Sequence, residues 1–290
     1  MSFERWYGQV NALREPDRIA LAKLLADEDP RTVQLLQDTL AARGEEGIRL
    51  LESIARDGEP VAQRNATLIL RVLRETVAWE ALARFCATCG SHFDIEVASW
   101  LVARTRYPDF DEAAYRTRID QMARELRERL TGRETPRATI EVCNHYLFRT
   151  LGFRGNRQDY YDPDNSYLNR VLDRRVGIPI SLSVLYLLLA RRLHLPLVGI
   201  NMPAHFLLKW HSTTTSFYFD PFHEGELFDE ADCRELCKRL GVVFNPVFLT
   251  PTTPQIILLR MCNNLQAIYA DREPARAEQF GRCAAMLSRV

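Results

Sequence analysis

The sequence predicts an α+β protein that is mostly helical, with a small antiparallel sheet between helical regions. Three observations predict this class. Apolar residues recur at three- and four-residue spacing over most of the chain, as they do in amphipathic helices. The spacing changes to two between residues 197 and 220, as in short strands, and helical spacing returns from Pro254 to Val290. A chain of 290 residues that is 47% hydrophobic can bury a large core.

Charge and composition exclude several classes of partner. Lysine and arginine together number 38, as do aspartate and glutamate. This balance provides no global positive field, so we expect neither nucleic acid nor a membrane as a partner. The N-terminus lacks the features of a signal peptide, and the longest apolar run, Val184–Ala190, is too short to span a bilayer. We therefore expect a cytoplasmic protein whose seven cysteines are reduced thiols.

Turn and linker residues indicate where helices begin and where one domain boundary lies. Asp29-Pro30 and Glu59-Pro60 each begin a helix, which suggests HEAT-like hairpins in the first region, although a plain helical bundle is the alternative. The polar segment Thr131–Thr139 has glycine and proline but no periodicity, and we place a domain boundary there. The predicted regions are helical residues 1–90, a helical hairpin at 91–135, the core at 136–245 and C-terminal helices at 246–290.

The core region is predicted to contain three helices followed by three strands. The helix Ser181–Leu193 is apolar on nearly every side, which is typical of a central buried helix. The other two helices cover residues 140–151 and 166–175. The strands are 197–202, 206–210 and 216–220, and a turn across 211–215 joins the last two as a hairpin.

The predicted hairpin places a histidine beside an aspartate. If its loop is centred near residues 213 and 214, His205 lies opposite Phe222, and Asp220 is its diagonal neighbour on the same sheet face. In enzymes with a cysteine nucleophile, such a histidine activates the thiol and the carboxylate orients the histidine. The cysteine belongs in the first turn of a helix, where the helix dipole stabilises its thiolate.

The longest motif of the chain lies around this helix and hairpin. It runs from GFRGN through DYYDPDNSYLNRVLDRRVGIPISLSVLYLLLARRLHLPLVGINMPAHFLLKW to FYFDPF. This motif strongly resembles the bacterial SirB-type branch of the transglutaminase-like superfamily. The preceding DIEVASWLVARTRYPDFDEAAY looks like the N-terminal region of that family, and FLTPTTPQIILLRMCNNLQAIY is similar to its tetratricopeptide-like C-terminal helices. The resemblance covers about Asp94–Tyr269 and implies a transglutaminase-like, papain-like core.

The resemblance implies a triad that has lost its nucleophile. In the wider superfamily, a Gly-x-Cys motif begins the buried helix, and the histidine and aspartate follow on later strands. Carried across without gaps, the cysteine position is Pro179, whereas His205 and Asp220 match. Ser181 lies on the wrong face of the helix, and Ser183 lies about 6 Å further along its axis, so Ser183 is only a weak substitute.

A polar and aromatic cluster precedes the buried helix and is a candidate binding site, because loops that carry such residues often bind ligands or partners. Turn and cap chemistry explains part of it equally well. The candidate binding residues are Asp159, Tyr160, Tyr161, Asn165 and Tyr167. Ala204 is a separate departure, because the SirB-type pattern usually has glycine before the histidine.

One pattern could offer metal ligands. Cys86, Cys89 and His92 form C-x-x-C-x-x-H, but structural zinc sites need four ligands and no second cluster completes this set. We therefore predict packing roles for the cysteines and no metal site. The sequence contains no phosphate loop and no dinucleotide fingerprint, and we expect no cofactor.

Two functions from different classes remain. The missing nucleophile, the helical regions at both ends and related domains in eukaryotic F-box proteins favour a pseudoenzyme, a protein-binding or regulatory module that contacts a protein partner through its helical surfaces. In that interpretation His205 and Asp220 are remnants of a degenerate triad. The alternative is a hydrolase or acyltransferase, protease- or transglutaminase-like, in which both act with an unidentified nucleophile. A thiol or hydroxyl within hydrogen-bonding reach of the His205 ring would favour the enzyme.

Overall fold

The computed structural model describes residues 15–27, 29–132 and 134–289, which belong to two compact units. The first unit extends to Ala78 and includes Tyr107–Asp109, and the second contains residues 79–106 and the chain from Phe110 onward. The boundary falls inside helix α5, Pro60–Thr88, whereas the sequence analysis ended its first region at residue 90. The second part of α5 belongs with the C-terminal helices because Trp79 packs edge-on against Phe280, with ring centroids 4.7 Å apart.

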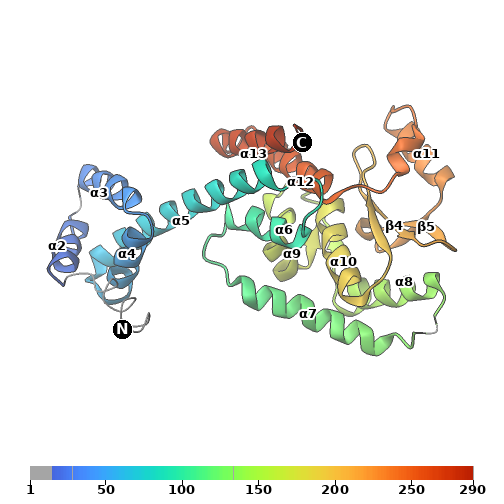
Figure 1. Ribbon diagram of the computed structural model, residues 1–290, viewed down its shortest axis with the longest axis horizontal. Helices are drawn as coiled ribbons and strands as arrows, with labels where there is room; N and C mark the ends of the chain where they lie inside the picture. Colours follow the sequence, from blue (N-terminus) through green and yellow to red (C-terminus); the bar gives the residue numbers. More distant parts are fainter. Residues whose placement is uncertain (1–14, 28, 133, 290) are drawn as a thin grey trace, which may run out of the picture. The chain divides into compact units, whose positions relative to one another are not determined.

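The first unit consists of helices (Figure 1). They pack around a core of leucine, isoleucine and alanine side chains. Its helices are α2 Glu15–Leu25, α3 Pro30–Ala42, α4 Glu45–Asp57 and the first part of α5. The carboxylate of Asp29 caps α3 by accepting a hydrogen bond from the Arg31 N–H group at 3.0 Å. The helix starts that the sequence predicted at Pro30 and Pro60 are confirmed.

The second unit is built around α10, Pro179–Leu193, which is buried along most of its length, as its apolar sequence predicted. Thr135 caps α8, Pro136–Asn144, and a π-helix follows it directly, so the helix predicted at 140–151 begins earlier and ends as a π-helix. The helices of this unit are α6 Ile95–Arg104, α7 Glu112–Arg129, α8 Pro136–Asn144, η1 His145–Thr150, α9 Leu168–Arg174, α10 Pro179–Leu193, α11 Glu230–Arg239, α12 Pro254–Tyr269 and α13 Pro274–Leu287, with short 3₁₀ turns η2 Pro163–Asn165, η3 Pro221–His223 and η4 Pro246–Leu249.

Four antiparallel strands form the main sheet, in the order β3-β4-β5-β6. They are β3 Leu197–Ile200, β4 Leu207–His211, β5 Ser216–Asp220 and β6 Glu226–Phe228. His211 pairs with Ser216 and Leu208 with Phe219, which is the register that the sequence predicted. The sequence analysis did not predict β6 or the two-residue parallel strands β1 Arg154–Gly155 and β2 Val176–Gly177. The mostly helical α+β class is confirmed.

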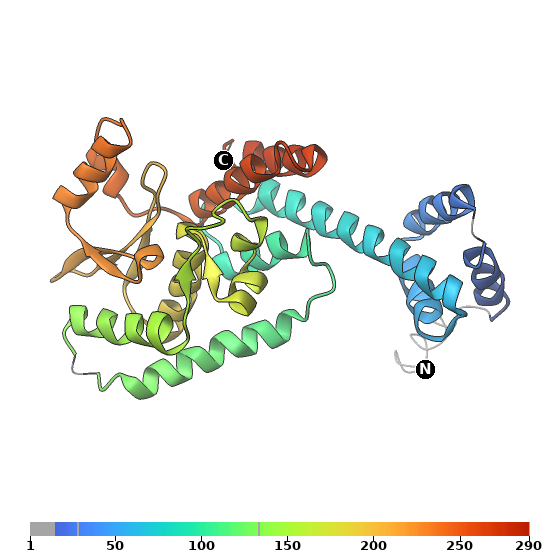
Figure 2. The same ribbon diagram turned by 180° about the vertical axis from the view of Figure 1, so that it is seen from behind.

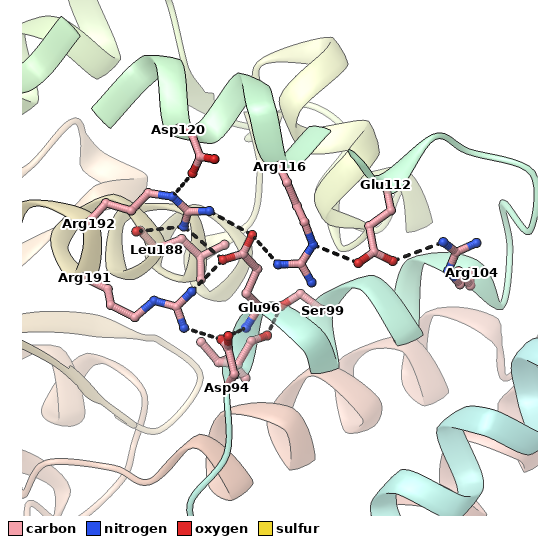
Figure 3. Close-up of polar contacts among 11 residues, drawn as sticks. Asp94, Glu96, Ser99, Arg104, Glu112, Arg116, Asp120, Leu188, Arg191 and Arg192 are labelled. Carbon is pink, nitrogen blue, oxygen red and sulfur yellow. Dashed lines mark hydrogen bonds and ion pairs between the residues drawn. The ribbon is translucent and has the colours of Figure 1, made fainter. Parts of the chain in front are cut away.

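A buried ion-pair network joins α6, α7 and α10 (Figure 3). Glu96 on α6 is fully buried, and it accepts from Arg116 on α7 at 3.0 Å and from Arg192 on α10 at 2.9 Å. Arg191 lies 2.7 Å from the same carboxylate. A charge without solvent is tolerated only with such partners, so the network fixes the C-terminal end of α10.

The C-terminal helices α12 and α13 lie side by side in both ribbon views (Figures 1 and 2). The buried hydroxyl groups of Tyr167 and Tyr269 lie 2.9 Å apart and join α12 to the segment before α9. Arg276 on α13 donates to the Thr105 carbonyl at 2.7 Å. The helices are therefore part of the second unit, although the sequence analysis treated them as a separate region. Within the part of the chain that the structure describes, no helix is long and apolar enough to cross a membrane.

Candidate functional site

His205 and Asp220 form a hydrogen-bonded pair at one end of the main sheet. Asp220 is the last residue of β5, and His205 lies in the segment between β3 and β4. The Nε2 atom of His205 lies 2.6 Å from Oδ2 of Asp220. The Asp220 side chain has no exposed surface and that of His205 is 12% exposed. The structure thus brings together the two residues that the hairpin register placed as diagonal neighbours.

A second histidine, which sequence reasoning missed, shares the same carboxylate oxygen. The 3₁₀ turn Pro221–His223 directs His223 back toward Asp220, and its Nδ1 atom lies 2.6 Å from Oδ2. The other oxygen, Oδ1, accepts from the Phe222 N–H group at 2.8 Å. The sequence DPFH carried the signal, because an aspartate followed by proline favours a turn that returns the chain to its own side chain.

The three side chains determine the charge state of the carboxylate. Burial by itself raises the pKa of Asp220, because it removes water from the charged form. Hydrogen bonds from His205 and His223 act in the opposite direction and outweigh burial, so the pKa is lowered to about 2. Asp220 is therefore a buried carboxylate at neutral pH.

The position that the resemblance assigns to the nucleophile is a buried proline, Pro179, the first residue of α10. Ser181 Oγ donates to the Asn165 carbonyl at 2.5 Å and accepts from the Ile178 N–H group at 3.0 Å, so this serine caps the helix. Ser183 Oγ is buried and has no hydrogen-bond partner within the described residues. In that same part of the chain, the only side-chain hydrogen bond of the His205 ring is the one to Asp220.

Six of the seven cysteines are buried, and Cys89 is half-buried. Burial raises the pKa of the Cys143 thiol to about 12, and it raises that of Cys233 to the same range. Cys86 contacts the thiols of Cys262 and Cys283 inside the helical packing, and a hydrogen bond with Cys262 raises its pKa further. Such thiols stay protonated at neutral pH and are weak nucleophiles.

The C-x-x-C-x-x-H pattern does not gather into a ligand set. His92 accepts or donates a hydrogen bond with Ser91, 2.8 Å away, while Cys86 faces the other buried thiols. Among the described residues, the only group of three or more histidine, cysteine, aspartate or glutamate side chains that could hold a metal ion is His205, Asp220 and His223.

The predicted binding cluster separates into buried and exposed members. Asn165 and Tyr167 are fully buried, so they cannot contact a partner directly. Asn165 instead donates to the Asp159 carbonyl at 2.7 Å and holds the loop. Asp159 and Tyr161 are exposed, and the Tyr160 ring packs edge-on against Phe222. The exposed residues of the loop therefore lie next to the turn that carries His223.

An arginine that the sequence analysis did not single out is bound to the loop before His205. Arg260 on α12 donates from Nη1 to the Met202 carbonyl at 3.2 Å and to Asn201 Oδ1 at 3.0 Å. The Met202 carbonyl also accepts from the His205 N–H group at 3.2 Å. Burial lowers the pKa of Arg260, and neighbouring Tyr160 acts against that effect. These contacts anchor the His205 segment to the C-terminal helices.

Ala204, in the same segment, has a left-handed backbone conformation with φ of 52°. Only glycine adopts this conformation without a steric cost from Cβ. The structure thus explains why glycine suits the position before the histidine, and Ala204 carries strain there. Its side chain is exposed, so the added methyl group does not crowd the interior.

Comparison with known proteins places this site inside a shared domain. Residues 113–263 match the transglutaminase-like superfamily. A UPF0162 protein of Xylella fastidiosa is 37% identical over 190 residues, which are 63% of this chain and 67% of that protein. A UPF0162 protein of Pseudomonas aeruginosa is 32% identical over 189 residues, with the same coverage of 63% and 67%. The human F-box only protein 21 is 37% identical over 137 residues, 44% of this chain but 21% of that protein. No solved structure matches the chain.

Proposed function

Because the chain belongs to the transglutaminase-like superfamily, we propose that it is a non-catalytic member of the SirB-type branch that acts as a protein-binding or regulatory module. The observation that carries this proposal is Pro179 at the first position of α10. A proline suits this position structurally, since the first helical N–H group has no partner within the helix. It offers no group that could attack a substrate.

The surroundings of His205 support the same proposal. An imidazole held by a carboxylate needs a thiol or hydroxyl on its other side to serve nucleophilic catalysis. In the described part of the chain, neither the serines of α10 nor any cysteine thiol is hydrogen-bonded to this ring, and six of the seven thiols are buried. The pair with Asp220 is therefore available for recognition rather than for acyl transfer.

We assign the contact surface to the loop beside η3. Tyr161 is 64% exposed, and its ring lies edge-on to Tyr160, which in turn packs against Phe222. Exposed tyrosines supported by packed aromatic neighbours are favoured in protein interfaces because little side-chain entropy is lost on binding. The shared domain in F-box only protein 21 makes up a small part of that protein, which fits a module that operates within larger assemblies.

The competing function is a hydrolase or acyltransferase, and one observation favours it. The 2.6 Å contact with Asp220 Oδ2 uses Nε2 of His205, and Nδ1 has no hydrogen-bond partner among the described residues, so Nδ1 could act as a general base. Hydrolysis of amides and transfer to amines should therefore be assayed with the intact chain and with His205→Ala. We expect no turnover above the rate of the uncatalysed reaction in buffer alone. An activity that the substitution abolishes would overturn the non-catalytic proposal.

Partner binding is tested by affinity capture from the native cell with single surface substitutions. Tyr161→Ala should lose the captured protein, whereas Val243→Ala, whose side chain is 90% exposed and lies outside the loop, should retain it. Equal capture by both variants and by the wild type would contradict the assigned surface. Substitution is preferable to truncation before Asp94, because truncation would remove Trp79 from its contact with Phe280.

A further inference from the structure

Three potential ligand atoms converge at the end of the main sheet. Nε2 of His205, Oδ2 of Asp220 and Nδ1 of His223 all lie within 4.8 Å of one another. Both nitrogen atoms point at the same oxygen atom, at 2.6 Å each. We propose that these three side chains bind a divalent transition-metal ion of the zinc class. This inference goes beyond the proposed function and does not depend on it.

The donor set determines the class of ion. Two imidazole nitrogens and one carboxylate oxygen are ligands of Zn²⁺, Co²⁺ and related first-row ions, whereas Mg²⁺ and Ca²⁺ prefer oxygen ligands alone. Three protein ligands also leave at least one coordination position for water or for a group of a partner molecule. Because the His223 side chain is 35% exposed, the ion and that further ligand can reach the site from solvent.

Metal binding requires only local rearrangement. Without the ion, each imidazole donates a proton to Oδ2, from Nε2 of His205 and from Nδ1 of His223. When the ion takes the place of these protons, the proton of His205 moves to Nδ1 and that of His223 moves to Nε2. Both rings stay neutral, and no net proton is released. Bonds of about 2.0–2.1 Å to the ion require the nitrogen and oxygen atoms to separate slightly.

The groups around the carboxylate keep it aligned. Oδ1 of Asp220 is held by the Phe222 N–H group at 2.8 Å, so Oδ2 faces the two histidines. The Phe222 ring lies against Gly155, where a Cβ atom would come within 2.6 Å of the ring. A hydrogen bond to a metal ligand, such as the one that the Phe222 N–H group donates to Asp220, orients the ligand and raises the affinity of the site for the metal ion.

The binding test uses the intact chain, stripped with a chelator and titrated with Co²⁺ and then with Zn²⁺. We expect one equivalent of Co²⁺ to give visible d–d absorption without a thiolate charge-transfer band, and Zn²⁺ to displace it. Absence of binding would overturn the proposal. A thiolate band would do the same, because it would assign the ion to cysteines such as Cys86 and Cys89.

Matched histidine variants identify the ligands. His223→Ala should weaken Zn²⁺ binding about tenfold or more, and His223→Gln is a milder second variant that preserves the turn. The control is His211→Ala, which changes an exposed histidine of the same sheet outside the ligand group and should bind as the wild type does. Unchanged affinity in both His223 variants would refute the site. Partner capture is measured separately, so failure of the metal proposal leaves the proposed function standing.

Discussion

The Nδ1 atom of His223 lies 2.6 Å from the Oδ2 atom of Asp220, and the turn that begins at Pro221 creates this contact. The relationship makes Asp220 the centre of a site with two imidazoles rather than one. Both imidazoles contact the same oxygen atom of this one buried carboxylate.

Asp220 should make the stability of the protein depend on acidic pH. Its pKa is lowered to about 2 in the folded protein, so the ionised side chain stabilises the fold fully at pH values above the pKa in the unfolded chain, which is near 3.9. This stabilisation is lost as the pH falls through the pKa in the folded protein. It amounts to roughly 2 kcal/mol. Urea unfolding of the wild type and of Asp220→Asn at pH 7 and pH 2 measures it. The wild type should lose more stability than the variant, and equal losses would contradict this account.

Glu96→Gln should destabilise the second unit strongly. The fully buried carboxylate pairs with Arg116, Arg191 and Arg192, and its removal leaves these arginines with their second partners alone, Glu112, Asp94 and Asp120. We expect a loss of about 2–3 kcal/mol in the free energy of unfolding, because hydrogen bonds to a charged group are lost while the arginines keep other partners. The control is Glu278→Gln, which breaks an exposed pair with Arg282 and should cost less than about 1 kcal/mol. Similar losses from both substitutions in thermal unfolding would show that the network is unimportant.

Ser183→Ala should be neutral or stabilising. The Ser183 hydroxyl is buried without a hydrogen-bond partner in the described residues, so alanine removes a desolvated polar group and leaves no other group unpaired. We expect the free energy of unfolding to stay the same or to rise by up to about 1 kcal/mol. The same variant tests Ser183 as a substitute nucleophile. A clear loss of stability or of any acyl-transfer activity would show that the hydroxyl has a partner or substrate.

Gly225→Ala should be strongly destabilising. The glycine has φ of 80°, and a Cβ atom there would lie 2.0 Å from the Asn144 side chain. That asparagine donates to the Gly225 carbonyl at 3.1 Å and accepts from the Tyr186 hydroxyl at 3.1 Å, so the clash reaches α10. We expect a loss of at least about 1–3 kcal/mol. Gly241→Ala is the matched control, because its φ of 69° is similarly left-handed but no atom lies within 4 Å of the added methyl group. An equal loss in both variants would assign the effect to backbone strain alone.

The sequence predicted the contact between His205 and Asp220 because side chains alternate between the two faces of a strand. The pairing register of the hairpin therefore determines which residues share a face. Pairing of His211 with Ser216 makes residues 205 and 222 opposite positions, as the loop length required. The sequence did not predict His223, because its direction depends on a 3₁₀ turn after the strand. Nor did it separate Asn165 and Tyr167, which are buried, from the exposed Tyr161, because turn residues with the same polarity occur in both settings.

Local patterns alone determined the mostly helical α+β class, the register of the β4–β5 hairpin, where α3 and α5 begin, and that a proline stands at the start of the central helix. These features depend on periodicity, caps and backbone restrictions that neighbouring residues define. Only the tertiary structure decided that α5 is divided between two units, that six of the seven cysteines are buried, and that His223 joins Asp220. The packing of α5 depends on which helix faces meet across long sequence separations, and a periodic pattern does not specify the surface against which a face packs. The direction of His223 depends on the backbone of the turn after β5, which the periodic pattern does not specify either.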